Sequence, residues 1–143
     1  MLNEIYIFSK KYSPPKTTLK DAEIMSEWGE TQLEDREVDH SDPGNVSREE
    51  IEFYTMVYSF LEFEDFLFYL YPMAREFEKD KDFDNMEFFI TSFDSVLNKN
   101  LKKLNEEDHQ TLKRALLWLS ELHPIEYSGI DETLNIQKFI GYL

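Results

Sequence analysis

The sequence contains no cysteine among its 143 residues. This absence excludes disulfide bonds, thiol-based catalysis and zinc sites built on cysteine. Glycine and proline are also scarce, with four and five residues, whereas a β protein with many short strands needs more of both for its turns. No run of about 20 apolar residues is present, so we expect no transmembrane helix.

Positive charge is in short supply as well. Thirty acidic residues face 15 basic ones, which gives a formal net charge of −15. A field of this sign repels nucleic acids and anionic membranes and attracts cationic molecules. We therefore expect a basic protein as partner, and neither nucleic acid nor membrane. The first residues, MLNEIYIFSKKY, lack the basic and long apolar regions of a signal peptide, so we expect a cytoplasmic location.

Apolar and aromatic residues are plentiful. Hydrophobic residues make up 41% of the chain, with 12 Phe and 8 Tyr. A chain of this length buries roughly two-thirds of the surface that it exposes when unfolded. We expect one domain over residues 1–143, with an acidic polar segment at about 30–50.

Apolar residues recur at spacings of three and four, which is typical of helices. This pattern predicts an all-α, single-domain helical bundle of about five to seven helices. The segment EIYIF also fits a short strand, but a helix is favoured there. Pro72 predicts a kink in the helix that begins near residue 63. The expected helices cover about residues 2–12, 17–29, 48–60, 63–77, 86–104, 105–122 and 131–143.

The stretch DHSDPGNVSREE has two interpretations. Its spacing resembles a calcium-binding EF-hand loop with Gly44 in sixth place. The fifth position is Pro43, which offers no side-chain oxygen. In the favoured interpretation, Ser47 and Glu50 form a capping box at a helix start, and no metal is bound. The weaker alternative is a calcium site made by Asp39, Ser41, Asn45, Ser47 and Glu50.

Catalytic motifs are missing from the sequence. It has no glycine-rich phosphate loop and no nucleophile elbow. Carboxylates are so abundant that a pair of them carries no signal for acid–base catalysis. We therefore expect no enzymatic activity and no cofactor.

Four features of the first 80 residues resemble a family of small helical bacterial domains of unknown function. They are the apolar segment Ile5 to Phe8, the pair Pro14–Pro15, Trp28, and FLFYLYPM at 66–73. Tyr71 departs from the family pattern, and the family supplies no catalytic residues. In size and acidity the chain is also similar to bacterial immunity proteins, which bind and block a toxin domain, often a basic nuclease.

The second resemblance implies an immunity protein that blocks a basic toxin domain by steric and electrostatic occlusion. One alternative is a structural or housekeeping helical interaction domain without a toxin partner, and a further one is a calcium-binding module using residues 39–50. Exposed tyrosines would suit an interface, and Tyr54, Tyr58, Tyr69 and Tyr71 are candidates for a shared surface. The expected partner-binding residues are Trp28, Glu30, Glu34, Asp35, Glu37, Asp39 and Asp42.

Overall fold

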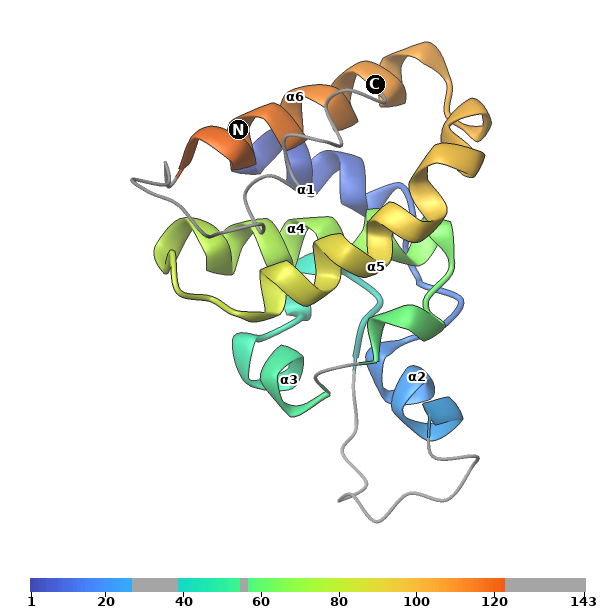
Figure 1. The fold of residues 1–143 in the computed structure, drawn as a ribbon, viewed down its shortest axis with the longest axis vertical. Helices are drawn as coiled ribbons and strands as arrows, with labels where there is room; N and C mark the ends of the chain where they lie inside the picture. Colours follow the sequence, from blue (N-terminus) through green and yellow to red (C-terminus); the bar gives the residue numbers. More distant parts are fainter. Residues whose placement is uncertain (27–38, 55–56, 123–143) are drawn as a thin grey trace.

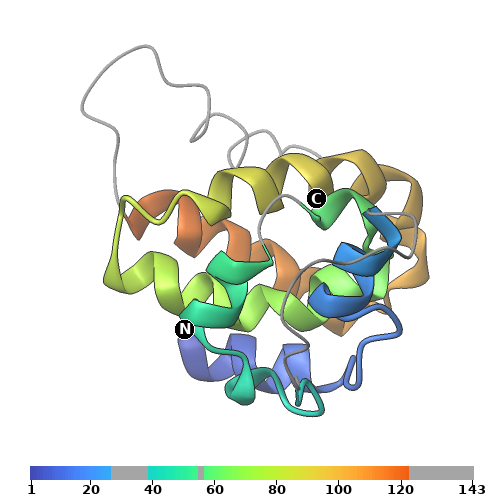
Figure 2. The same ribbon diagram turned by 90° about the horizontal axis from the view of Figure 1, so that it is seen from below.

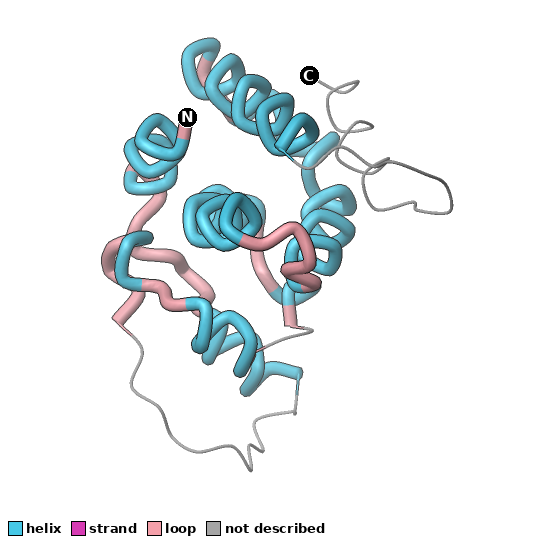
Figure 3. Tube along the Cα trace, turned by 90° about the vertical axis from the view of Figure 1, so that its left-hand side faces the viewer, coloured by secondary structure: helices cyan, strands magenta, loops and turns pink. Residues whose placement is uncertain are grey.

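The most aromatic stretch of the sequence forms the helix at the centre of the molecule. In the computed structural model, which describes residues 1–26, 39–54 and 57–122, helix α4 spans Phe63–Lys79 and buries most of its residues. Figure 3 shows α4 nearly end-on, with the other helices around it. The aromatic side chains of α4 therefore belong to the core, because several faces of this helix pack against neighbouring helices.

The described residues form six α-helices and no strand. This confirms the prediction of an all-α helical bundle. None of these helices is long and apolar enough to cross a membrane. In chain order the elements are α1 (Leu2–Lys10), α2 (Leu19–Ser26), the 3-10 turn η1 (Pro43–Asn45), α3 (Arg48–Phe53), η2 (Tyr58–Phe60), α4, α5 (Asn85–Asn100), η3 (Leu101–Lys103) and α6 (Glu106–Leu122).

Helices α1 and α5 lie on opposite sides of α4 (Figures 1 and 2). Helix α6 packs across α1 and α4. Between α4 and α5 the packing is aromatic, since the rings of Phe66 and Phe93 stack with centroids 5.1 Å apart. Just after the C-terminal end of α1, Lys11 and Tyr12 donate hydrogen bonds to the buried carboxylate of Asp108, both at 2.8 Å. These bonds attach the start of α6 to the end of α1.

Two acidic residues cap the start of α4. Glu62 and Asp65 form a capping box, in which each side chain accepts a backbone N–H of the other residue. The Asp65 carboxylate also accepts the N–H groups of Lys16 and Thr17. Burial raises the pKa of Asp65, and the N–H donors act in the opposite direction. This one carboxylate thus ties the proline-containing connection before α2 to the start of α4.

The helix expected over residues 48–60 is wrong in its length. Helix α3 ends at Phe53 and a separate turn, η2, begins at Tyr58. The backbone leaves the helical region at Tyr54, with φ −101° and ψ 44°, and Val57 and Tyr58 are buried beyond this break. The helix expected from residue 131 lies outside the described residues.

The prediction of a surface shared by four tyrosines is also wrong. Tyr54, Tyr58 and Tyr69 are at most 2% exposed, and Tyr71 is only partly exposed. The hydroxyl of Tyr58 accepts a hydrogen bond from the buried amide of Asn85. These rings fill the core because they occur on the inward faces of α3, η2 and α4, where their area contributes most to stability.

Helix α4 continues past Pro72, and a side chain from α1 enters its backbone just before the proline. The buried hydroxyl of Ser9 donates to the carbonyl of Leu67 at 2.8 Å and accepts the N–H of Tyr71 at 3.1 Å. Leu67 and Tyr71 are four residues apart, so in a regular helix these two groups bond to each other. Ser9 thus contacts both of these backbone groups and attaches α1 to α4 at that point.

Replacing Ser9 with Ala is expected to lower the free energy of unfolding by about 1–3 kcal/mol, because the substitution leaves a buried N–H and C=O without the bridging hydroxyl. Chemical denaturation measures the change. Ser95→Ala is the matched control, since the Ser95 hydroxyl is exposed and bonds within its own helix, and it is expected to stay within about 0.5 kcal/mol of wild type. Equal stabilities of the two variants would contradict the bridging role.

Candidate functional site

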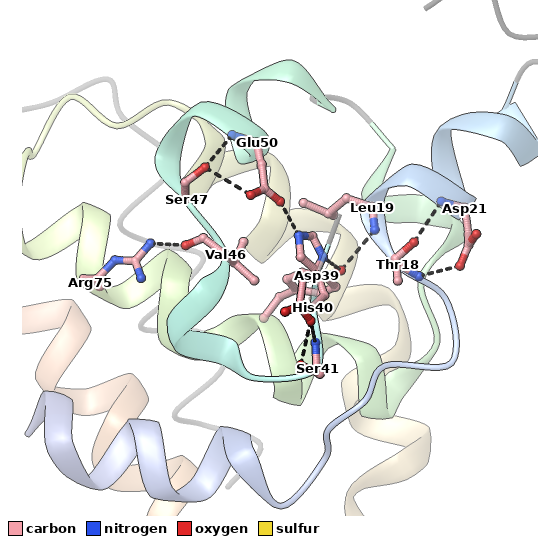
Figure 4. A network of polar contacts seen from close by, with 11 residues as sticks. Thr18, Leu19, Asp21, Asp39, His40, Ser41, Val46, Ser47, Glu50 and Arg75 are labelled. Atoms are coloured by element: carbon pink, nitrogen blue, oxygen red, sulfur yellow. Dashed lines mark hydrogen bonds and ion pairs between the residues drawn. The ribbon is translucent and has the colours of Figure 1, made fainter. Parts of the chain in front are cut away.

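The segment 39–50 is the described part of the acidic stretch, and a buried histidine attaches it to the core. The side chain of His40 is 0% exposed. Its Nδ1 lies 2.7 Å from the Tyr69 hydroxyl, and its Nε2 lies 2.5 Å from a carboxylate oxygen of Glu50. Figure 4 shows this network, in which Leu19 and Glu50 approach from either side of His40. The side chains of His40 and Tyr69 therefore connect helices α2, α3 and α4.

The hydrogen-bond partners of Tyr69 determine where the proton of His40 resides. The Tyr69 hydroxyl accepts the N–H of Leu19 at 3.0 Å, so its own proton is available for His40 Nδ1. If Nδ1 accepts, Nε2 carries the ring proton and donates it to the Glu50 carboxylate. With a proton on Nε2, every donor and acceptor from Leu19 to Glu50 has a partner. Burial raises the pKa of Tyr69 well above its ordinary value, so the phenol stays protonated and able to donate.

Asp42 holds the other side of this segment against α1. Its carboxylate accepts a hydrogen bond from the hydroxyl of Tyr6 at 2.9 Å and one from the N–H of Gly44 at 2.7 Å. The ammonium of Lys10 lies 3.5 Å from the same carboxylate. The Gly44 N–H is the main cause that lowers the pKa of Asp42. Asp42 is therefore ionised and already has internal partners.

Two arginines attach the second half of the segment. Arg75 of α4 donates to the carbonyl of Val46, whose side chain is buried. Arg48, the first residue of α3, bridges Glu52 and Asp80 with distances of 2.7 and 3.0 Å. The first contact fixes the turn before α3 on α4, and the second fixes α3 beside the α4–α5 connection.

The five residues of the calcium alternative have other contacts in the structure. Asp39 accepts from the N–H and hydroxyl of Ser41. Ser47 accepts the N–H of Glu50 at 3.1 Å, as predicted for a helix cap. The Glu50 side chain turns to His40, so only the serine half of the expected capping box forms. Asn45 ends η1. Among the residues that the structure describes, no group of three or more His, Asp or Glu side chains is arranged to hold a metal. Calcium binding stays a prediction.

The structure covers only part of the expected partner-binding surface. Asp39 is exposed and Asp42 is partly exposed, and both lie at the start of the attached segment. The other five residues of that set, Trp28, Glu30, Glu34, Asp35 and Glu37, lie outside the described residues. Their role stays a prediction.

His40 and Tyr69 are the residues of this site that sequence reasoning did not connect. They are 29 positions apart, and no spacing rule for helices or metal sites joins them. The signal that the sequence does hold is weaker. A histidine beside aspartates in a polar stretch, and a tyrosine in the middle of an apolar helix, are each polar groups that need a partner if buried.

Replacing Tyr69 with Phe is expected to lower the free energy of unfolding by about 2–4 kcal/mol, because both the Leu19 N–H and His40 Nδ1 then lose their partner in a buried place. Thermal and chemical denaturation measure the effect. Tyr71→Phe is the matched control on the same helix, because no described residue bonds to its hydroxyl. A Tyr69 variant as stable as that control would show that the network contributes nothing.

Comparison of the chain with protein-family models, with curated proteins and with solved structures gives no match. Function is therefore inferred from the residues of this chain. Some of its acidic groups hold the fold together, and others face solvent.

Proposed function

We propose that this chain is an immunity protein, a stoichiometric binder that blocks a basic toxin domain, with no catalytic role of its own. The observation that carries the proposal is the net charge of −15 together with its placement. Some acidic groups, such as Asp42, Asp65 and Asp108, are used inside the fold, and others, such as Glu49 and Asp82, are exposed. On the described surface, exposed carboxylates outnumber exposed cations.

The mechanism is steric and electrostatic occlusion. An acidic surface steers a basic protein toward it and raises the association rate above that of neutral partners. Carboxylates of this chain then take the positions of substrate phosphates against Arg and Lys of the toxin, with short charge-assisted hydrogen bonds. Asp39 begins the attached segment 39–50, where His40 is fixed to the core. Carboxylates near such an attachment lose less conformational entropy on binding than carboxylates on a free chain.

A basic partner, which binds through charge, suits this chain because its large aromatic rings are already buried. The large aromatic rings of α4 are buried against α1 and α5, and Lys10, Arg48 and Arg75 are paired internally. On the described surface, carboxylates therefore outnumber cations, although lysines such as Lys81 and Lys99 are also exposed. A partner rich in Arg and Lys complements it better than an acidic or an apolar one.

The test is co-expression with the basic proteins encoded directly beside this chain in its genome. One of them is expected to stop growth when expressed alone and to be neutralised by this chain, and the two are expected to co-purify. The dissociation constant should rise roughly tenfold between about 0.1 and about 0.5 M NaCl, because salt screens surface charge.

The control for this experiment is an unrelated acidic protein of similar size, which should not restore growth. If no neighbouring basic protein binds, the immunity function is wrong. If one binds with an affinity that salt leaves unchanged, the electrostatic mechanism is wrong.

A further inference from the structure

The start of α2 depends on a group from another helix. Leu19 is the first residue of α2, and the first N–H groups of a helix have no partner within it. The N–H of Leu19 donates instead to the hydroxyl of Tyr69 at 3.0 Å. Both residues are buried, so water has no access to this N–H in the folded chain. The hydrogen bond to Tyr69 therefore holds the start of α2 on α4.

The same hydroxyl faces His40, and the contact depends on the charge state of this histidine. A neutral imidazole has one nitrogen that donates and one that accepts, whereas an imidazolium donates from both. In the neutral ring, Nδ1 accepts the proton of Tyr69 over 2.7 Å, and Nε2 donates to Glu50 over 2.5 Å. The tyrosine, the histidine and the carboxylate then all have partners. This arrangement requires that Nδ1 carries no proton.

A second proton on His40 disturbs the side of the ring that faces Tyr69. The new N–H at Nδ1 points at a hydroxyl oxygen that already accepts from Leu19, and the proton of the phenol loses its acceptor. The phenol does not resolve this conflict by losing its proton, because burial raises the pKa of Tyr69 well above its ordinary value. One donor is therefore left without a partner in the core, which is costly.

The surrounding carboxylates favour a positive charge on His40, because an opposite charge nearby stabilises the protonated ring. They come from every segment that packs around the network: Asp21 of α2, Asp39, Glu50 of α3 and Asp65 of α4. The hydrogen bonds of these carboxylates are directed to other groups. Asp21 and Asp65 accept backbone N–H groups before α2, and Asp39 accepts from Ser41.

The side of the ring that faces Glu50 tolerates the second proton. Nε2 donates to Glu50 in both charge states, so this contact is kept. The Glu50 side chain is 22% exposed, and water therefore weakens the added attraction between the two charges. On the side of Tyr69 the contact is buried, and a lost partner is not replaced. Protonation thus keeps His40 on α3 and weakens the connection from Tyr69 to Leu19.

We propose that His40 is a proton-sensitive switch for the start of α2. While Nδ1 carries no proton, Tyr69 holds the N–H of Leu19, and a second proton on His40 releases it. Imidazole is the side chain that ordinarily gains a proton in mild acid, so acid is the signal to which the switch responds. This inference goes beyond the proposed function, because it concerns the chain without its partner.

The test is an NMR titration of the isotope-labelled full-length chain between about pH 8 and about pH 5. The ring nitrogens of His40 report its second proton, and hydrogen exchange reports the N–H of Leu19. After correction for the intrinsic effect of pH, the Leu19 N–H is expected to exchange roughly ten-fold faster once His40 is protonated. The N–H of Ala22 is the internal control, because it bonds to the carbonyl of Thr18 at 2.9 Å, and its protection is expected to stay unchanged.

Two variants show whether His40 causes the response. His40→Gln keeps polar groups at this position but gains no proton, so its Leu19 N–H is expected to lose the response to acid. This variant also separates His40 from Asp65, whose pKa burial raises and whose titration it leaves in place. His109→Gln is the matched control, because His109 lies on α6, and its response at Leu19 is expected to equal that of wild type.

Three results would overturn the switch. The first is a Leu19 N–H that stays protected after His40 has gained its second proton. The second is a His40 that gains no second proton over the pH range in which the chain stays folded. The third is a response to acid that persists in His40→Gln or disappears in His109→Gln. None of these results bears on the immunity function, which depends on the neighbouring basic proteins.

Discussion

The hydroxyl group of Tyr69 is the point on which the arrangement of the first half of the chain depends. It accepts the N–H of Leu19 and contacts His40, which in turn contacts Glu50. One oxygen on the central helix thus fixes the start of α2, His40 and, through His40, the first turn of α3. In a buried place each of these polar groups is costly without its partner, so the three segments have a single favourable arrangement.

Acidic residues serve two purposes in this molecule. Some are structural, since Asp65 caps α4 and holds the connection before α2, and Asp108 joins α1 to α6. The others face solvent and give the surface its negative field. This division explains how a chain with a net charge of −15 still forms an aromatic core. The carboxylates nearest to that core are stabilised by N–H donors and by cations. The excess negative charge stays on the surface, where water screens it.

The helices were predictable from the sequence because each buries one face, and the spacing of Ile5 and Phe8, or of Phe89 and Phe93, shows that face directly. The cap residue Ser47 was predictable for the same reason, because its partner is local. The contacts of Ser9 and His40 were not predictable. Their partners, Leu67, Tyr71 and Tyr69, are distant in sequence, and only the packing of α1 and segment 39–50 against α4 brings them together. The end of α3 was missed because apolar residues continue beyond it, and Tyr54, Val57 and Tyr58 are all buried.

Segment 39–50 is held on the bundle by a chain of hydrogen bonds that runs from Leu19 through Tyr69 and His40 to Glu50. The most direct test is an NMR measurement of the two ring nitrogens of His40. We expect a proton on Nε2 that exchanges slowly with solvent, and an unprotonated Nδ1 that accepts from Tyr69. A proton on Nδ1 alone, or a ring proton that exchanges freely with water, would contradict this arrangement.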